Sequence, residues 1–135
     1  MAADLSPLFP IISDDEASPR VAAVFADIRE TRKTDFINNF WRVIANDPDN
    51  LEQTWAELKH VMAPGAIDSM TKDLIYVAVS VANNCTYCIR SHTASARTKG
   101  ATDEHLKELQ AVIAAASRTN RLAIGLQVPL DEAFI

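Results

Sequence analysis

Basic residues are too few in this 135-residue chain to balance its acidic ones. The chain has 13 Lys and Arg against 18 Asp and Glu, a formal net charge of −5. This charge gives no electrostatic reason to expect nucleic acid or an anionic membrane as a partner. An apolar run over residues 74–82 is also too short to cross a bilayer, which needs about 20 residues. We therefore expect neither nucleic acid nor a membrane as a partner.

The sequence also gives no indication of a secretion signal or of a structural disulfide. Residues 1–7 contain neither the basic segment nor the apolar core of a signal peptide, so we expect a cytoplasmic protein. The chain has two cysteines, Cys85 and Cys88, with two residues between them. In a cytoplasmic chain this spacing favours a redox or metal-binding pair over a structural disulfide.

Sustained period-two alternation, which is typical of strands, does not occur between the turn signals. Apolar residues recur instead at helical spacing, for example after the cap formed by Ser18 and Pro19. We expect an extended segment over residues 1–17 and one compact all-α domain over residues 18–135. The predicted helices start near Pro19, Asp35, Pro48, Asp68, Cys85 and Thr102, the second ends near Ala45, and a shorter piece lies near Arg121.

Residues 84–92 hold both cysteines of the chain and one of its three histidines. On a helix turning by about 100° per residue, Cys85, Cys88 and His92 lie on one face. The asparagines at 83–84 favour the end of one helix and the start of another, and Gly100 is typical of a helix C-terminus. Both thiols thus fall near a helix N-terminus, where the amides and the helix dipole favour a thiolate. The segment predicts a helix hairpin that carries the cysteine pair.

The spacing of four residues then points to a known family. Asp73, eleven intervening residues and then Cys85-x-x-Cys88-x-x-x-His92 resemble the motif of the carboxymuconolactone decarboxylase superfamily, on its alkyl hydroperoxidase D (AhpD) branch. The resemblance covers about residues 67–118 closely. Two positions depart from the common pattern, because the family usually has glutamate in place of Asp73, and some members have histidine in place of Tyr87.

This resemblance implies a thiol-dependent (hydro)peroxide reductase with no bound cofactor or metal. In AhpD-like proteins the second cysteine attacks the peroxide and the first closes the disulfide, which assigns these roles to Cys88 and Cys85. A dithiol reductant then reopens the disulfide, and a lipoyl-type protein is one candidate. His92 would assist thiolate formation, with Asp73 orienting it or charging it through a relay. The family also forms trimers or hexamers, so we expect a homo-oligomer.

Reasoning from the residues alone leaves two points open. The helix dipole favours Cys85, nearest the free amides, as the more acidic thiol, so either cysteine could attack first. In a simple hairpin, Tyr76 or Val77 lies opposite His92, and Asp73 falls about a turn, roughly 5 Å, too far away. Asp73 would then reach His92 only through helix tilt, a water or another side chain, or would simply face solvent at a helix edge.

Other classes of function remain as alternatives. A non-enzymatic redox sensor or thiol-disulfide adaptor would keep the cysteines and consume peroxide only stoichiometrically. A lactone decarboxylase of the same superfamily is disfavoured, because such enzymes generally lack the cysteine pair. A zinc-stabilised module would use Cys85, Cys88, His92 and His105, but the order of the gaps reverses that of the usual finger. Otherwise we expect His60 and His105 to be solvent-facing helix residues.

Overall fold

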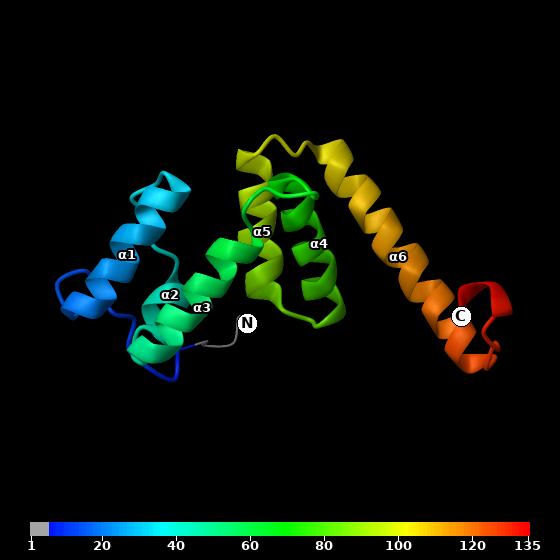
Figure 1. Cartoon of the computed structure of the whole chain (residues 1–135), viewed down its shortest axis with the longest axis horizontal. Helices are drawn as coiled ribbons and strands as arrows, with labels where there is room; N and C mark the ends of the chain where they lie inside the picture. Colours follow the sequence, from blue (N-terminus) through cyan, green and yellow to red (C-terminus); the bar gives the residue numbers. More distant parts are fainter. Residues whose placement is uncertain (1–5) are drawn as a thin grey trace. The chain divides into compact units, whose positions relative to one another are not determined.

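The computed structural model describes residues 6–135, and it is helical (Figure 1). Within this range no strand is present, which confirms the all-α prediction. The chain divides into two compact units, Met1–Ala63 and Pro64–Ile135. The prediction of one domain over residues 18–135 stays a prediction, and the part of the expected extended segment before residue 6 lies outside the described residues.

The first unit contains α1 (Pro19–Arg32), α2 (Asn39–Ile44) and α3 (Pro48–Val61), and both α1 and α2 pack on α3. Helix α1 starts as predicted, with the Ser18 side chain accepting the Val21 amide and with proline in the first turn. The core is formed by apolar side chains at helical spacing, among them Phe25, Ile28, Trp41, Leu51 and Trp55.

Helix α2 is shorter than the sequence predicted. We expected it to begin near Asp35, but residues 35–38 are irregular and Asn38 is the N-cap. The Arg29 Nε donates to the Asp35 carbonyl, which fixes this carbonyl outside any helix. Ile37 is buried in the core from this irregular segment. The spacing between Ile37 and the next apolar residues matches that of a helix although Ile37 is not helical. The sequence therefore predicted a start of α2 that is too early.

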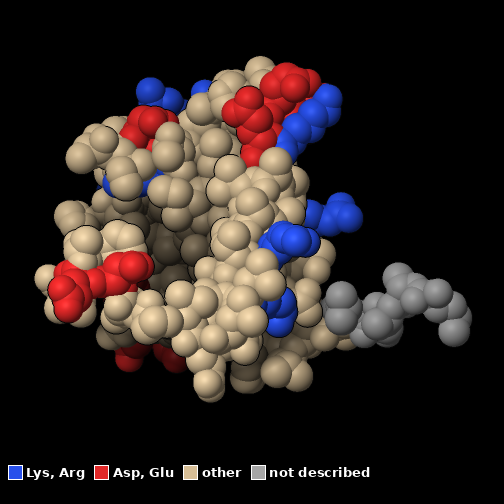
Figure 2. Space-filling view, turned by 90° about the vertical axis from the view of Figure 1, so that its right-hand side faces the viewer, with Lys and Arg blue, Asp and Glu red and all other residues tan. Residues whose placement is uncertain are grey.

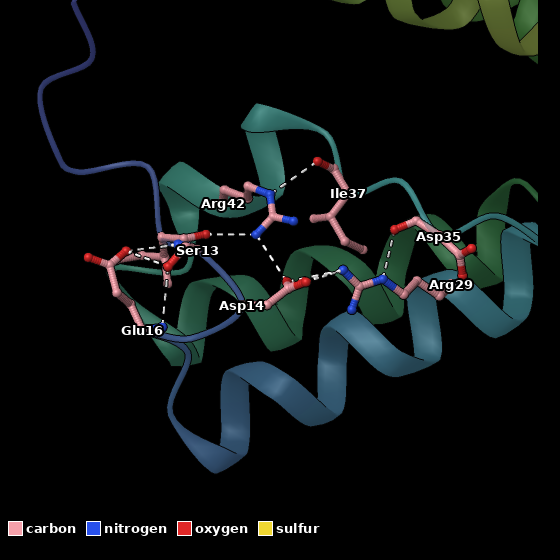
Figure 3. Close-up of polar contacts among 8 residues, drawn as sticks. Ser13, Asp14, Glu16, Arg29, Asp35, Ile37 and Arg42 are labelled. Carbon is pink, nitrogen blue, oxygen red and sulfur yellow. Dashed lines mark hydrogen bonds and ion pairs between the residues drawn. The ribbon is translucent and has the colours of Figure 1, made fainter.

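The described residues before α1, 6–18, form no helix, and side chains of the first unit hold part of this segment in place. The Asp14 carboxylate bridges the guanidinium groups of Arg29 and Arg42 at 2.8 Å and 3.2 Å (Figure 3). Arg42 also donates to the Ile12 carbonyl, and Asn46 donates to the Pro10 carbonyl. These bonds tie residues 10–14 to α1 and to the region of α2.

The second unit is built on a helix hairpin of α4 (Ser69–Ala82) and α5 (Thr86–Thr98), as predicted. The connection is short: Asn84 takes a left-handed conformation with φ 57°, and the Cys85 amide donates to the Ser80 carbonyl. Asparagine tolerates this conformation better than most residues do. Gly100, with φ 102°, ends the hairpin after α5, where the sequence predicted a C-terminal cap.

Helix α6 (Asp103–Gly125) is one continuous helix of 23 residues, followed by a short 3-10 helix, η1 (Glu132–Phe134). The separate short piece predicted near Arg121 was wrong, because alanine, leucine and arginine residues carry the helix through that region and Gly125 falls at its last position. Helix α6 contacts α4, but none of its residues is buried. Across residues 6–135, no helix combines the length and apolar composition that crossing a bilayer requires.

Candidate functional site

The hairpin joins Asp73 of α4 directly to His92 of α5. The Nδ1 atom of His92 lies 2.9 Å from Oδ1 of Asp73, and Asp73 is only 1% exposed. The expectation that Asp73 falls about a turn short of His92 was therefore wrong, and so was the alternative of a solvent-facing residue. The stacking of Tyr76 on the His92 ring, with centroids 3.6 Å apart, matches the expected neighbour of this histidine.

The tight connection explains the direct contact. The hydrogen bond from the Cys85 amide to the Ser80 carbonyl reverses the chain at these two residues. Asp73 lies seven residues before Ser80, and His92 lies seven residues after Cys85. Seven residues make about two helical turns, so both side chains return to the facing surfaces at the same height. From the sequence we had placed Ser80 or Val81 opposite Cys88, whereas the structure bonds Ser80 to Cys85, about one helical turn earlier in α5.

Two further residues of α5 bind the same carboxylate. Ser95 Oγ and Lys99 Nζ donate to Oδ2 of Asp73 at 2.8 Å and 2.5 Å. Burial alone would raise the pKa of Asp73, but hydrogen bonds from His92, Lys99 and Ser95 outweigh it and hold the pKa below its usual value. The buried group is therefore a carboxylate anion with donors on both oxygens.

Sequence reasoning did not find Ser95 and Lys99. A signal was present, since both follow His92 at intervals of three and seven residues and so share its helix face. Without the register of the hairpin, however, nothing indicated that this face meets a buried carboxylate. The other buried polar side chain of α4, Ser80, is satisfied by donating to the Tyr76 carbonyl.

The two cysteines lie at the start of α5, as predicted, and both are free thiols of intermediate burial. Cys85 is the N-cap residue, and Cys88 lies in the first turn, one turn before His92. Hydrogen bonds from the Cys88 amide, the Cys88 thiol and the Tyr87 amide lower the pKa of Cys85. Burial and the neighbouring Cys85 raise the pKa of Cys88 to about 11. In the reduced pair, Cys85 is the more acidic thiol, in the direction that the helix dipole favours.

The remaining histidines lie on exposed helix surfaces, as predicted. His60 is exposed on α3, and His105 is exposed in the first turn of α6, where its side chain takes part in a capping box with Thr102. Over residues 6–135, no three His, Cys, Asp or Glu side chains are placed to hold a metal ion together.

Comparison with known proteins agrees with this architecture. A crystal structure titled as the alkylhydroperoxidase AhpD core from Rhodospirillum rubrum superposes with a TM-score of 0.92 and 49% sequence identity, over 95% of this chain and 96% of that one. The fold is thus that of an AhpD core. The sequence pattern of the carboxymuconolactone decarboxylase family matches residues 48–129, and the chain belongs to this family.

A curated relative adds no activity. "Uncharacterized protein 4 in cox locus" from Paracoccus denitrificans is 48% identical over 50 residues. The match spans 37% of this chain and 45% of that protein, so the chain spans less than half of the relative that it matches.

Proposed function

We propose that this protein is a thiol-dependent peroxide reductase that cycles Cys85 and Cys88 between dithiol and disulfide. The observation that carries the proposal is the position of the buried Asp73–His92 pair. His92 follows Cys88 by one helical turn, and a carboxylate with a lowered pKa binds Nδ1 of its imidazole. Such an arrangement provides a thiol, a base to accept the thiol proton and an acceptor that orients the base.

The cycle balances with a peroxide as oxidant and a dithiol as reductant. A cysteine thiolate attacks one peroxide oxygen, the O–O bond breaks, and the sulfenic acid and an alcohol or water result. The second thiol then attacks the sulfenic sulfur, expelling water and forming the Cys85–Cys88 disulfide. A dithiol partner, for which a lipoyl group is one candidate, reduces this bond by thiol-disulfide exchange and is itself oxidised. No cofactor is needed in this scheme.

The roles of the two thiols follow the family assignment, with Cys88 attacking and Cys85 resolving. The raised pKa of Cys88 means that this thiol needs a base in order to react near neutral pH. His92 is well suited to be this base, because Nδ1 donates to Asp73 when the ring is neutral and Nε2 then carries the free lone pair. The lowered pKa of Cys85 supports the reverse assignment, which trapping of the sulfenic acid would establish.

The test is peroxide consumption with a dithiol reductant, combined with intact mass before and after oxidation. Catalytic turnover supports the reductase. Loss of two hydrogens from the mass without turnover would replace the proposal with a redox sensor or thiol-disulfide adaptor. A bound metal detected on the reduced protein would favour the zinc-stabilised module instead.

We further propose that the protein acts as a homo-oligomer, a trimer or hexamer. Helix α6 has an apolar side but no buried residue, and several large apolar side chains of α6 and the following segment are exposed. In Figure 2, residues other than Lys, Arg, Asp and Glu make up most of the surface that faces the viewer. Exposed apolar surface of this kind supports association, and copies of one chain associate most often with closed symmetry.

A further inference from the structure

Lys99 shares the buried carboxylate with His92, yet it lies at the far end of α5 from the cysteines. It is the C-cap residue of α5, where the helix dipole favours a cation. Its ammonium is 2.5 Å from Oδ2 of Asp73, whereas His92 uses Oδ1. The Lys99 side chain is 33% exposed and the Asp73 side chain 1%. The lysine therefore lies between the buried carboxylate and the solvent.

We propose that Lys99 is a positioning residue that acts on His92 through Asp73. By pairing with Oδ2 of the buried carboxylate, Lys99 weakens the attraction between Asp73 and a proton on His92, which favours the tautomer that donates from Nδ1 and leaves Nε2 to take a proton. The effect of Lys99 on reaction rate rests on the proposed peroxide reductase function. Its effect on the imidazole depends only on the cluster of Asp73, His92, Ser95 and Lys99.

The argument is one of charge within a buried group. Without Lys99, Asp73 would keep a hydroxyl donor from Ser95 and one group able to become cationic, His92. A buried carboxylate with a single cationic partner strongly favours protonation of that partner. With Lys99 present, the carboxylate is already paired with a cation. Asp73 therefore stabilises the protonated form of His92 less.

The surroundings of His92 leave few other groups that could have this effect. Helix α4, which packs against α5, presents Asp73 and Tyr76 to the imidazole. On α5 itself, the thiols of Cys85 and Cys88 precede His92 on the same face, by two turns and one turn, and Lys99 follows it by two turns. Lys99 is therefore the cation of this cluster. Ser95 provides an internal comparison, because it binds the same oxygen as Lys99 but carries no charge.

The experiment is an NMR titration of the histidine rings in the full reduced chain, with the His92 signal assigned from its loss in His92→Ala. Lys99→Met should move the titration midpoint of His92 upward by about one pH unit, the lower end of the effect of one nearby charge. Lys99→Arg, which keeps the charge, should restore the wild-type midpoint. Lys107→Met is the matched control, because it removes a lysine from an exposed ion pair on α6.

The outcomes separate charge from folding and from catalysis. A His92 midpoint in Lys99→Met equal to that of the wild type would overturn the proposal, as would an equal shift in Lys107→Met. If circular dichroism shows that Lys99→Met is unfolded, Lys99→Gln takes its place with the same expected shift. In an active enzyme, the acid limb of the pH-rate profile should move upward with the midpoint. Absence of peroxide turnover in the wild type would reject the reductase, while the titration would still decide the role of Lys99.

Discussion

Replacing Asp73 with asparagine should destabilise the second unit, by an amount that depends on pH in a specific way. The substitution preserves shape and one acceptor oxygen but removes the charge that binds Lys99 and His92. A hydrogen bond to a charged group contributes about 1.5–3 kcal/mol. Lys99 is partly exposed, so hydrogen bonds to water can replace part of the stabilisation that its ammonium loses with the Asp73 charge. We therefore expect the free energy of unfolding to fall by about 2–3 kcal/mol at pH 7.

The sign of the pH dependence follows from the lowered pKa of Asp73. An aspartate in an unfolded chain titrates near pH 3.9, at about its model-peptide value. A carboxylate whose folded pKa is lower stabilises the fold fully above that pH, and this contribution is lost as the pH falls through the folded pKa. Below that point the wild type carries a neutral carboxyl, much like the asparagine variant. The stability gap between the two proteins should therefore be wide at pH 5 and close as the pH falls below about 4.

Urea denaturation of the two proteins at several pH values between 3 and 7 measures this gap. Asp103→Asn is the control, because Asp103 pairs with Arg97 on the surface of the same unit and exposed ion pairs contribute only about 0–1 kcal/mol. Equal stability of the wild type and Asp73→Asn at pH 7 would refute the reasoning. A gap that stayed constant from pH 7 to pH 3 would show that the loss comes from packing and that the charge of Asp73 contributes nothing.

Further predictions concern the reaction and the assembly. Cys88→Ser should abolish peroxide reduction, whereas Cys85→Ser should allow one oxidation and then stall; dimedone should label Cys88 in the latter, and labelling of Cys85 in the former would exchange the roles. His92→Ala should slow the reaction and raise the pH at which thiolate absorbance appears, and an unchanged rate and pH profile would exclude His92 as the base. Asp73→Glu should keep most of the rate while Asp73→Asn depresses it, and equal rates in all three proteins would remove the carboxylate from the mechanism. Light scattering at micromolar concentration should give a multiple of 14.8 kDa, and a monomer mass would contradict the oligomer.

Local sequence signals predicted the helices well, whereas contacts between helices depended on details that such signals do not contain. Cap residues such as Ser18 and the asparagines at 83–84 act within one turn, so their pattern is visible in the chain. Ile37 is apolar and buried but not helical, so periodicity extended α2 too far. The Asp73–His92 contact depends on the length of the connection between α4 and α5 to within about one residue. The contact between Lys99 and Asp73 depends on the same register.

The hydrogen bond between the Cys85 amide and the Ser80 carbonyl has a consequence for comparing and engineering related chains. One residue inserted between Ser80 and Cys85 could not keep both this hydrogen bond and the present register, in which Asp73 and His92 each lie seven residues from the bonded positions. Both helices and the cysteine motif would survive, but His92 would no longer face Asp73. We therefore expect a related chain with a longer or shorter connection at this point to place the acidic partner of its histidine at another position on the helix that corresponds to α4. An alignment that permits gaps between Ser80 and Cys85 would pair the wrong residues.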